Sequence, residues 1–273
     1  MLCTLFPLAE QLPEALSEGL HDEATLVADF VRLVEVVLET AHGLTRDRAI
    51  VAGHLVRIVK IGRRMLRDLA DGDGDQQFPL TRQYLDSYSS LVYLLSPPPS
   101  DQTRFDQYLK DSLVAELDLL RAAREVGMTD AAPERIGSQV EQQLLDELDR
   151  ALTTAGITES EVPGRRKIGW PSAEVRMRAV GDGAYLAYRS GSNAVHGTWI
   201  DLLRAQLTLA GDGTFSARLA AERFRPDVLR RFVRLGVPVI RLCLPDARLD
   251  GALSALERRA GELERRAREL DRA

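Results

Sequence analysis

The fold is organised around the stretch Tyr185-Leu-Ala-Tyr188-Arg189-Ser-Gly-Ser192-Asn193-Ala-Val-His196-Gly197. On an unbroken helix, Arg189 and His196 would share one face about 10 Å apart, with Ser192 and Asn193 between them. Glycine lowers helix propensity by about 1 kcal/mol and serine often caps helices, so we expect a kink or restart at residues 190–192, with Ser192 as N-cap. His196 would then lie in the first turn of the next helix, near the positive end of its dipole, where a phosphate can approach.

Apolar residues recur at helical spacing on both sides of this stretch, and they predict an all-α, multi-helix bundle. Helices are expected over residues 8–41 (as two helices), 48–70, 79–95, 101–126, 133–151, 172–180, 192–209 and 226–236. The apolar run at residues 237–244 contains Pro238 and predicts either an edge strand or an extended buried link.

Four segments follow from this pattern. Residues 1–70 form an N-terminal helical extension, residues 71–210 a helical bundle that carries the Arg/His site, and residues 211–245 a connector. Residues 246–273 form a C-terminal amphipathic helix of coiled-coil type. Its apolar positions alternate four and three apart, at Leu249, Leu253, Leu256, Ala260, Leu263, Ala267 and Leu270. This seam could join two subunits or lie along its own bundle, and we favour oligomerisation, as a dimer.

Composition excludes several classes of protein. A net charge of −5 argues against indiscriminate nucleic-acid coating, and no apolar run approaches the ~20 residues that span a bilayer. The start of the sequence lacks a basic region and a cleavage site, so we expect no secretion signal and no membrane association. Cys3 and Cys243 are expected to be free thiols, which fits a cytoplasmic protein without a cysteine-based zinc site.

Positive charge gathers ahead of the central stretch. Residues 165–189 hold six basic and two acidic side chains, a net +4. Arg165, Arg166 and Lys167 are candidates for a phosphate-binding patch; the alternative is a solvated basic loop.

The helix expected over residues 79–95 carries a polar stripe of Arg82, Asp86, Ser89 and Tyr93 beside an apolar stripe that contains Tyr84 and Tyr88. The polar stripe either lies in the interior, where it serves a site or braces the bundle, or forms an Arg82–Asp86 pair on the surface. We expect the two tyrosines to be core residues. The preceding Asp71-Gly-Asp-Gly-Asp75 does not fit the EF-hand register and predicts a solvated turn.

Residues 78–208 resemble a bacterial helical domain family of unknown function, whose signature is Tyr or Tyr-Arg followed by Ser and then His. Tyr188-Arg189-Ser190-Gly191-Ser192-Asn193-Ala194-Val195-His196 is similar to it. Trp170 and Glu174 resemble the Trp and acidic helix upstream of that signature. Arg82-Gln-Tyr-Leu-Asp86 resembles the family's Arg-x-x-x-Glu helix, with Asp in place of Glu.

The spacing of Arg189 and His196 is also similar to the Arg-x(4–6)-His signature of the HEPN superfamily, although Ser190 stands where an Asn, Asp or His is usual. This resemblance implies a metal-independent endoribonuclease whose site assembles at a dimer interface. It also implies a role as a toxin or antiviral effector, with an antitoxin or defence-system protein as partner.

The residue chemistry fits that expectation. Cleaving RNA without a metal or cofactor needs a base for the 2′-OH proton, and histidine titrates near neutral pH. It also needs a cation for the phosphoryl oxygens, which an arginine supplies. His196 would be the general base or acid and Arg189 the phosphate stabiliser, with Ser192 and Asn193 orienting groups and Tyr188, Asp86, Arg82 and Tyr185 supporting them.

Other interpretations stay open. His196 could brace the bundle through a buried network with Tyr188, Ser192 and Asp86, the site could sense a nucleotide or other ligand, or the chain could be a non-catalytic helical scaffold. The exposure of His196 distinguishes these interpretations, because catalysis needs an exposed imidazole, whereas a bracing role would bury it.

Overall fold

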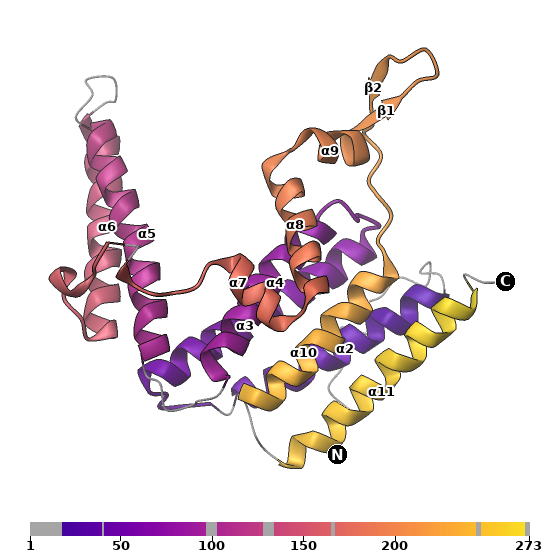
Figure 1. Ribbon diagram of the computed structural model, residues 1–273, viewed down its shortest axis with the longest axis horizontal. Coiled ribbons are helices and arrows are strands. Elements are labelled where there is room, and N and C mark those ends of the chain that lie inside the picture. The colour runs from indigo at the N-terminus through magenta and orange to yellow at the C-terminus, as the bar shows by residue number, and fades with distance from the viewer. Residues whose placement is uncertain are drawn as a thin grey trace. The chain divides into compact units, whose positions relative to one another are not determined.

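The computed structural model describes residues 18–39, 41–96, 103–127, 134–164, 167–243 and 247–270. These residues form helices and one small antiparallel sheet, which confirms the all-α prediction (Figure 1). The longer helices are α2 (Glu18–Glu39), α3 (Arg46–Ala70), α4 (Gln77–Leu95), α5 (Thr103–Gly127), α6 (Glu134–Ala155), α7 (Ala173–Val180), α8 (Asp182–His196), α10 (Pro226–Cys243) and α11 (Ala247–Leu270). The short elements are η1 (Glu159–Glu161), α9 (Trp199–Asp201), the π-helical turn η3 (Leu202–Gln206), β1 (Leu207–Leu209) and β2 (Phe215–Ala217).

The described chain forms two compact units. Unit 1 comprises the described residues of Met1–Leu44, Ala49–Leu95 and Ala173–Ala273, and unit 2 those of Thr45–Arg48 and Ser96–Ser172. In unit 1, α10 packs against α2, α4 and α11, while α7 and α8 pack on α4. Figure 1 shows α2, α10 and α11 side by side.

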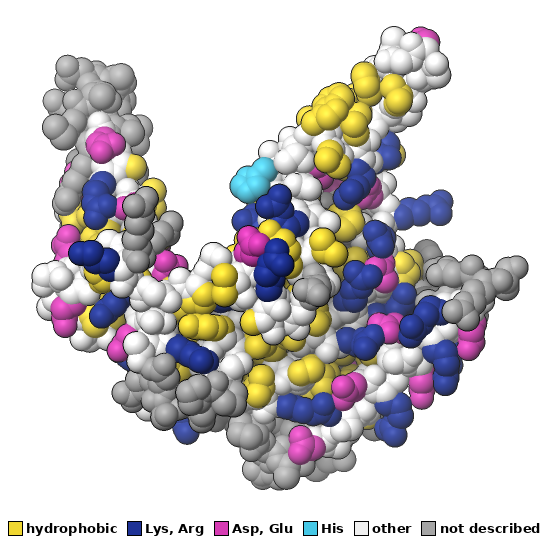
Figure 2. Space-filling view, in the orientation of Figure 1, with side chains coloured by type: hydrophobic (Ala, Val, Ile, Leu, Met, Phe, Trp, Pro, Cys, Tyr) yellow, Lys and Arg dark blue, Asp and Glu magenta, His cyan; other side chains and the backbone are white. Residues whose placement is uncertain are grey.

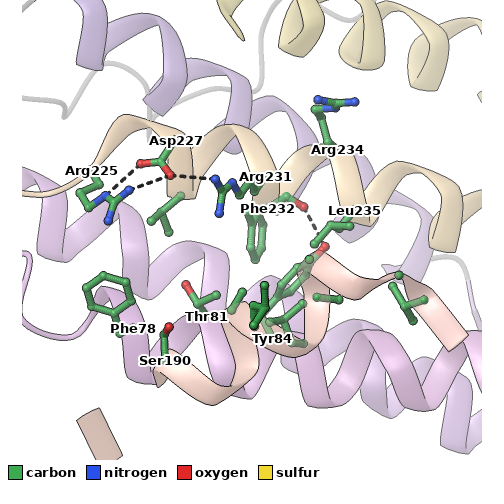
Figure 3. A pocket seen from close by; sticks show the side chains of 18 of the residues that line it. Phe78, Thr81, Tyr84, Ser190, Arg225, Asp227, Arg231, Phe232, Arg234 and Leu235 are labelled. Atoms are coloured by element: carbon green, nitrogen blue, oxygen red, sulfur yellow. Dashed lines mark hydrogen bonds and ion pairs between the residues drawn. The ribbon is translucent and has the colours of Figure 1, made fainter. Parts of the chain in front are cut away.

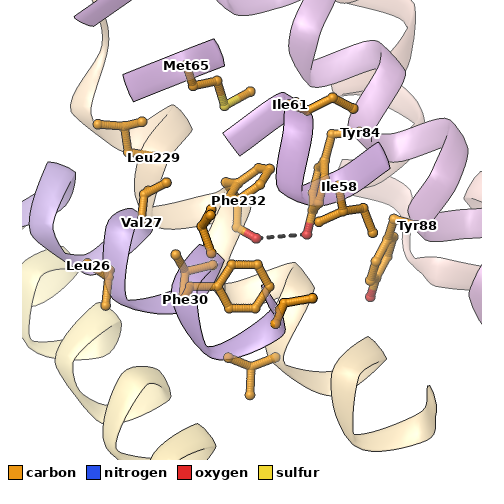
Figure 4. Packing of buried hydrophobic residues seen from close by; sticks show 14 of the residues in the cluster. Leu26, Val27, Phe30, Ile58, Ile61, Met65, Tyr84, Tyr88, Leu229 and Phe232 are labelled. Atoms are coloured by element: carbon orange, nitrogen blue, oxygen red, sulfur yellow. Dashed lines mark hydrogen bonds between the residues drawn. The ribbon is translucent and has the colours of Figure 1, made fainter. Parts of the chain in front are cut away.

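Aromatic rings at the centre of unit 1 join α2, α4 and α10 (Figure 4). The rings of Phe30 and Phe232 meet edge to face at 5.7 Å, and Tyr84 lies 4.4 Å from Phe232. The buried Tyr84 hydroxyl donates a 2.7 Å hydrogen bond to the Phe232 carbonyl. Both Tyr84 and Tyr88 are buried, so the prediction that they are core residues is confirmed.

Helix α10 continues beyond the expected end at residue 236 to Cys243, so the edge strand or extended link predicted for residues 237–244 is wrong over the described residues 237–243. Pro238 lies inside the helix, where a proline costs about 3 kcal/mol or more. Its neighbours Val237, Val239 and Ile240 are fully buried, and burying each contributes about 1.5–3 kcal/mol. The apolar contacts therefore outweigh the lost helix hydrogen bond.

A glycine allows the closest approach in this core. A Cβ added at Gly236 would lie 2.3 Å from Cζ of Phe30, so only glycine admits the ring at that distance. The segment expected to be a connector thus contains a central core helix.

The apolar seam of α11 is used within the chain. Leu253, Leu256, Ala260 and Leu263 are buried, and α11 packs against both α2 and α10. Arg259 donates to Asp29 of α2 at 3.0 Å, and Arg241 of α10 lies 2.9 Å from Glu257. The seam predicted either a contact between two subunits or packing within its own bundle. These four residues pack within their own bundle.

Unit 2 is built on the helix pair α5 and α6. It has a small core of Leu113, Leu117, Leu120 and Leu148. Trp170 packs edge to face against Tyr108 at 5.4 Å.

Two further expectations concern the ends of the bundle. The first helix expected over residues 8–41 lies largely outside the described residues, and the second corresponds to α2. The helix expected over residues 192–209 is interrupted at Gly197, and the helical turns α9 and η3 that follow end at Gln206, where a hairpin begins. Its turn, Gly211-Asp-Gly-Thr214, is the predicted turn, and Asp212 accepts hydrogen bonds from the Thr214 backbone and hydroxyl.

Candidate functional site

Helix α8 runs without a break from Asp182 to His196 and ends at Gly197, whose φ of 56° is left-handed. The predicted kink, with Ser192 as N-cap, is therefore wrong. Ser192 instead donates a 3.0 Å hydrogen bond to the carbonyl of Tyr188, one turn back in the same helix. His196 lies in the last turn, at the negative end of the helix dipole, and not in a first turn.

The glycine that suggested a break has a packing role. A Cβ at Gly191 would lie 2.6 Å from the Phe78 carbonyl oxygen and 2.7 Å from the Cβ of Arg82. Glycine thus lets α8 cross closely over α4, and this contact compensates for its low helix propensity. Such a crossing cannot be read from local sequence.

Because α8 is unbroken, Arg189, Asn193 and His196 lie on one face of it, at spacings of four and three residues. Arg189 and His196 are about 10 Å apart along the axis. Both are exposed, and Asn193 is half-buried. Among the described residues, neither the Arg189 nor the His196 side chain has a hydrogen bond or ion pair. Their functional groups are open to a ligand.

The supporting tyrosines contact arginines. The Arg82 guanidinium lies over the ring of Tyr188, 5.4 Å from its centre, and Arg178 lies 4.9 Å from the centre of the Tyr185 ring. Each contact joins α8 to a neighbouring helix, α4 in the first case and α7 in the second. They hold the helix that carries Arg189 and His196 in place.

Asp86 does not pair with Arg82. It accepts a 3.2 Å hydrogen bond from the buried Arg176 of α7. With Arg82 on Tyr188, the polar stripe of α4 faces α7 and α8, and the surface Arg82–Asp86 pair is not formed. Ser89 of the same stripe is buried. We therefore infer that the polar stripe holds α4 against its neighbouring helices.

The candidate phosphate-binding residues are distributed differently. Arg165 and Arg166 lie outside the described residues. Lys167 is exposed and belongs to unit 2, whereas Arg189 and His196 belong to unit 1.

Next to His196 in the sequence, the chain exposes an apolar surface that the sequence did not predict. The term apolar surface refers below to a set of exposed hydrophobic side chains: Val195, Trp199, Ile200, Leu202, Leu203, Leu209 and Phe215. Trp199 packs edge to face on Phe215 at 5.6 Å, which ties α9 to the hairpin. Figure 2 shows hydrophobic side chains gathered over α9 and the hairpin base. Apolar patches of this kind mark contacts with other proteins.

A second feature that the sequence did not reveal is a groove between α8 and α10, with α4 as its floor. Its volume is about 820 Å³. Its walls come from helices far apart in the sequence, so no local motif could have indicated it.

Other reactive groups are less suited to chemistry. Burial raises the pKa of the Cys243 thiol to about 12, so it is a poor nucleophile, and Cys3 lies outside the described residues. Within the described ranges, no group of three or more His, Cys, Asp or Glu side chains is placed to hold a metal ion. Nor does any helix in those ranges combine the length and apolarity needed to cross a membrane.

Comparison with known protein families gives a match over part of the chain. The model of a family of unknown function, DUF5677, matches residues 48–213, from α3 to the hairpin turn. This range contains the whole Arg189/His196 stretch and leaves out α2, α10 and α11. No curated protein matches the chain. No solved structure matches it either.

Proposed function

The chain belongs to the family of unknown function DUF5677, and from this premise we propose that it is a HEPN-like, metal-independent endoribonuclease that acts in the cytoplasm. One observation carries the proposal. Arg189 and His196 are exposed on the same face of a single unbroken helix, and neither side chain is engaged within the described chain. A bracing role for His196 would have required burial and hydrogen bonds.

The reaction follows from the two side chains. The His196 imidazole takes the proton of a ribose 2′-OH, and the 2′ oxygen attacks the adjacent phosphorus. The bond from phosphorus to the 5′ oxygen breaks, and the protonated His196 gives its proton to that oxygen and returns to its neutral form. Arg189 stabilises the charge that develops on the phosphoryl oxygens. The products are a 2′,3′-cyclic phosphate and a 5′-hydroxyl end.

Positioning comes from the rest of α8. Asn193 lies between Arg189 and His196 on the same face and can orient the phosphate. Ser192 and Tyr188 position the catalytic side chains indirectly. Ser192 donates a hydrogen bond to the Tyr188 carbonyl within α8, and the Tyr188 ring contacts Arg82 of α4. Asp86 contributes indirectly, since its pair with Arg176 fixes α7 against α4.

The axial rise of about 10 Å between Arg189 and His196 on one helix suggests that one phosphodiester meets groups from two copies of the chain. The apolar surface begins at Val195, directly beside His196, and offers a contact for a second copy. We therefore propose a homodimer that brings Arg189 of one protomer toward His196 of the other. A toxin or defence effector of this kind would have an antitoxin or defence-system protein as partner.

The test is RNA cleavage in EDTA by the purified protein, with tRNA, rRNA and mRNA as substrates. Wild type should leave 2′,3′-cyclic phosphate ends. His196→Ala should lower the rate by about 10²–10⁴-fold and Arg189→Ala by about 10²-fold or more, since they remove the base and the phosphate stabiliser. The exposed residues His21 and Arg258 supply matched controls, because His21→Ala and Arg258→Ala should cleave at the wild-type rate.

Mixing the two inactive variants tests the shared site. If each site uses both copies, His196→Ala mixed with Arg189→Ala should regain part of the wild-type rate. Expression of wild type, but not of either variant, should slow bacterial growth. A wild type that leaves every RNA class intact contradicts the nuclease.

The second candidate function is a non-catalytic interaction module. The exposed apolar surface favours it, because such a surface suits protein contacts without any chemistry. An inert wild type that self-associates or captures a partner through Trp199 and Ile200 would support this alternative.

A further inference from the structure

The groove between α8 and α10 has the dimensions of a ligand site. Its volume of about 820 Å³ falls within the range of roughly 300–1,000 Å³ that is usual for small-molecule sites. All of its lining residues belong to unit 1. Figure 3 shows Phe78, Thr81 and Ser190 on one side and, on the other, Arg231 and Arg234 of α10 with Arg225 directly before that helix.

The interior of the groove is apolar. Phe78, Leu85, Val228 and Phe232 line it, together with the small residues Ala184 and Ala187 of α8. Tyr84 also lines the groove, and its hydroxyl already donates to the Phe232 carbonyl and so offers no hydrogen to a ligand. This interior suits an uncharged hydrocarbon or aromatic body.

The rim on the α10 side is cationic and incompletely neutralised. Three arginines and two carboxylates line the groove, which leaves one positive charge, 3 − 2 = +1. Arg225 binds both oxygens of Asp227, at 3.1 and 3.2 Å, and Arg234 pairs with Glu264.

Arg231 carries the surplus charge. Its nearest carboxylate oxygen is Oδ2 of Asp227, 3.4 Å away, and Arg225 already occupies that oxygen. Within the described chain Arg231 has no hydrogen bond, and its side chain is 64% exposed. A guanidinium with free donors at the mouth of an apolar groove can bind a carboxylate with two parallel hydrogen bonds.

We propose that this groove binds an amphiphilic monoanion, with the apolar body between α8 and α10 and a carboxylate head on Arg231. A single surplus guanidinium selects a single negative charge, so a nucleotide with its two or more phosphate charges fits less well. The charged residues of the rim lie outside residues 48–213 that the family model matches, so the groove joins the matched part of the chain to helices beyond the match.

The site is separate from the Arg189/His196 face. Ser190 lines the groove, and Arg189 lies one residue further back, about 100° around the same helix. Neither Arg189 nor His196 lines the groove. The proposal does not rest on the nuclease activity.

The test measures binding to the full chain by isothermal titration calorimetry, with each probe below its critical micelle concentration. Dodecanoate should bind with one site per chain and at least tenfold more tightly than dodecyltrimethylammonium, which has the same chain and the opposite charge. Arg231→Glu should weaken dodecanoate binding at least tenfold. The matched control Arg258→Glu, which changes an exposed arginine of α11 outside the groove, should stay within twofold of wild type.

A second variant tests the apolar interior without altering charge. Gly183 lines the groove, and a Cβ added there meets no atom within 4 Å, so Gly183→Leu should fold and occupy part of the cavity. It should weaken dodecanoate binding several-fold without lowering the melting temperature.

Three results would overturn the proposal. Equal affinity for the anionic and cationic probes, or full affinity in Arg231→Glu, would remove the role of the surplus arginine. Tenfold tighter binding of dodecyl phosphate than of dodecanoate would contradict a site for a single charge. Binding of an acidic amphipathic peptide, without any binding of dodecanoate, would make the groove a docking site for a protein helix.

Discussion

At the scale of single residues, Gly191 decides how closely α8 lies on α4. A methyl group there would meet the Phe78 carbonyl at 2.6 Å, and backbone cannot move aside cheaply. We expect Gly191→Ala to lower the free energy of unfolding by about 1–3 kcal/mol. Gly183→Ala in the same helix is the matched control, since its Cβ has open space. It should raise stability by up to about 1 kcal/mol. Urea unfolding of the two variants measures both effects, and equal changes would contradict the close crossing.

His54 makes stability depend on pH. Burial in α3, with the charges of Arg57 and Arg176 nearby, lowers the pKa of His54 from 6.5 to about 4. Protonation therefore favours the unfolded chain. The stability that the neutral side chain contributes is complete above about pH 6.5 and is lost as the pH falls toward 4.

The difference between the two pKa values corresponds to about 3 kcal/mol. Between pH 7.5 and 4.5, wild type should lose about 2–3 kcal/mol more than His54→Leu, in which this group cannot titrate. Urea unfolding at both pH values tests this. The slope of the unfolding free energy with pH is the relevant readout, and parallel pH profiles would show that His54 has the same pKa in the folded and unfolded chain.

At the scale of helices and strands, periodicity alone located most of the structure. The expected helices at residues 48–70, 79–95 and 172–180 correspond to α3, α4 and α7. The errors occur where a tertiary contact overrides a local signal. Gly191 suggested a break but serves the crossing with α4, and Pro238 suggested an end but lies in a helix held by fully buried neighbours. The hairpin after Gln206 was missed because each of its strands has only three residues.

The candidate site was predictable to a similar degree. Helical spacing predicts that Arg189 and His196 share a face if the helix is unbroken, and the structure meets that condition. The partners of the supporting residues could not be predicted, because Asp86 pairs with Arg176 ninety residues further on. The groove was equally hidden, since α4, α8 and α10 are brought together only by folding.

At the scale of the whole molecule, the two units differ in how much apolar surface they bury. Unit 1 has an extensive core built on α2, α3, α4, α10 and α11, whereas the hydrophobic cluster among the described residues of unit 2 is built on four buried leucines. Backbone amides become exposed more readily where fewer apolar contacts must be broken. We expect amides in α5 and α6 to exchange at least about tenfold faster than those in α4 and α10. Hydrogen–deuterium exchange with mass spectrometry measures this, and uniform protection across all four helices would indicate that the chain opens as one cooperative body.

The chain's two indoles are divided between these units: Trp170 packs on Tyr108 in unit 2, and Trp199 on Phe215 in unit 1. Each half of the protein thus has its own intrinsic fluorophore. Replacing either tryptophan by phenylalanine would leave an emission signal from a single half, so the unfolding of each could be followed optically in the intact polypeptide without any added dye.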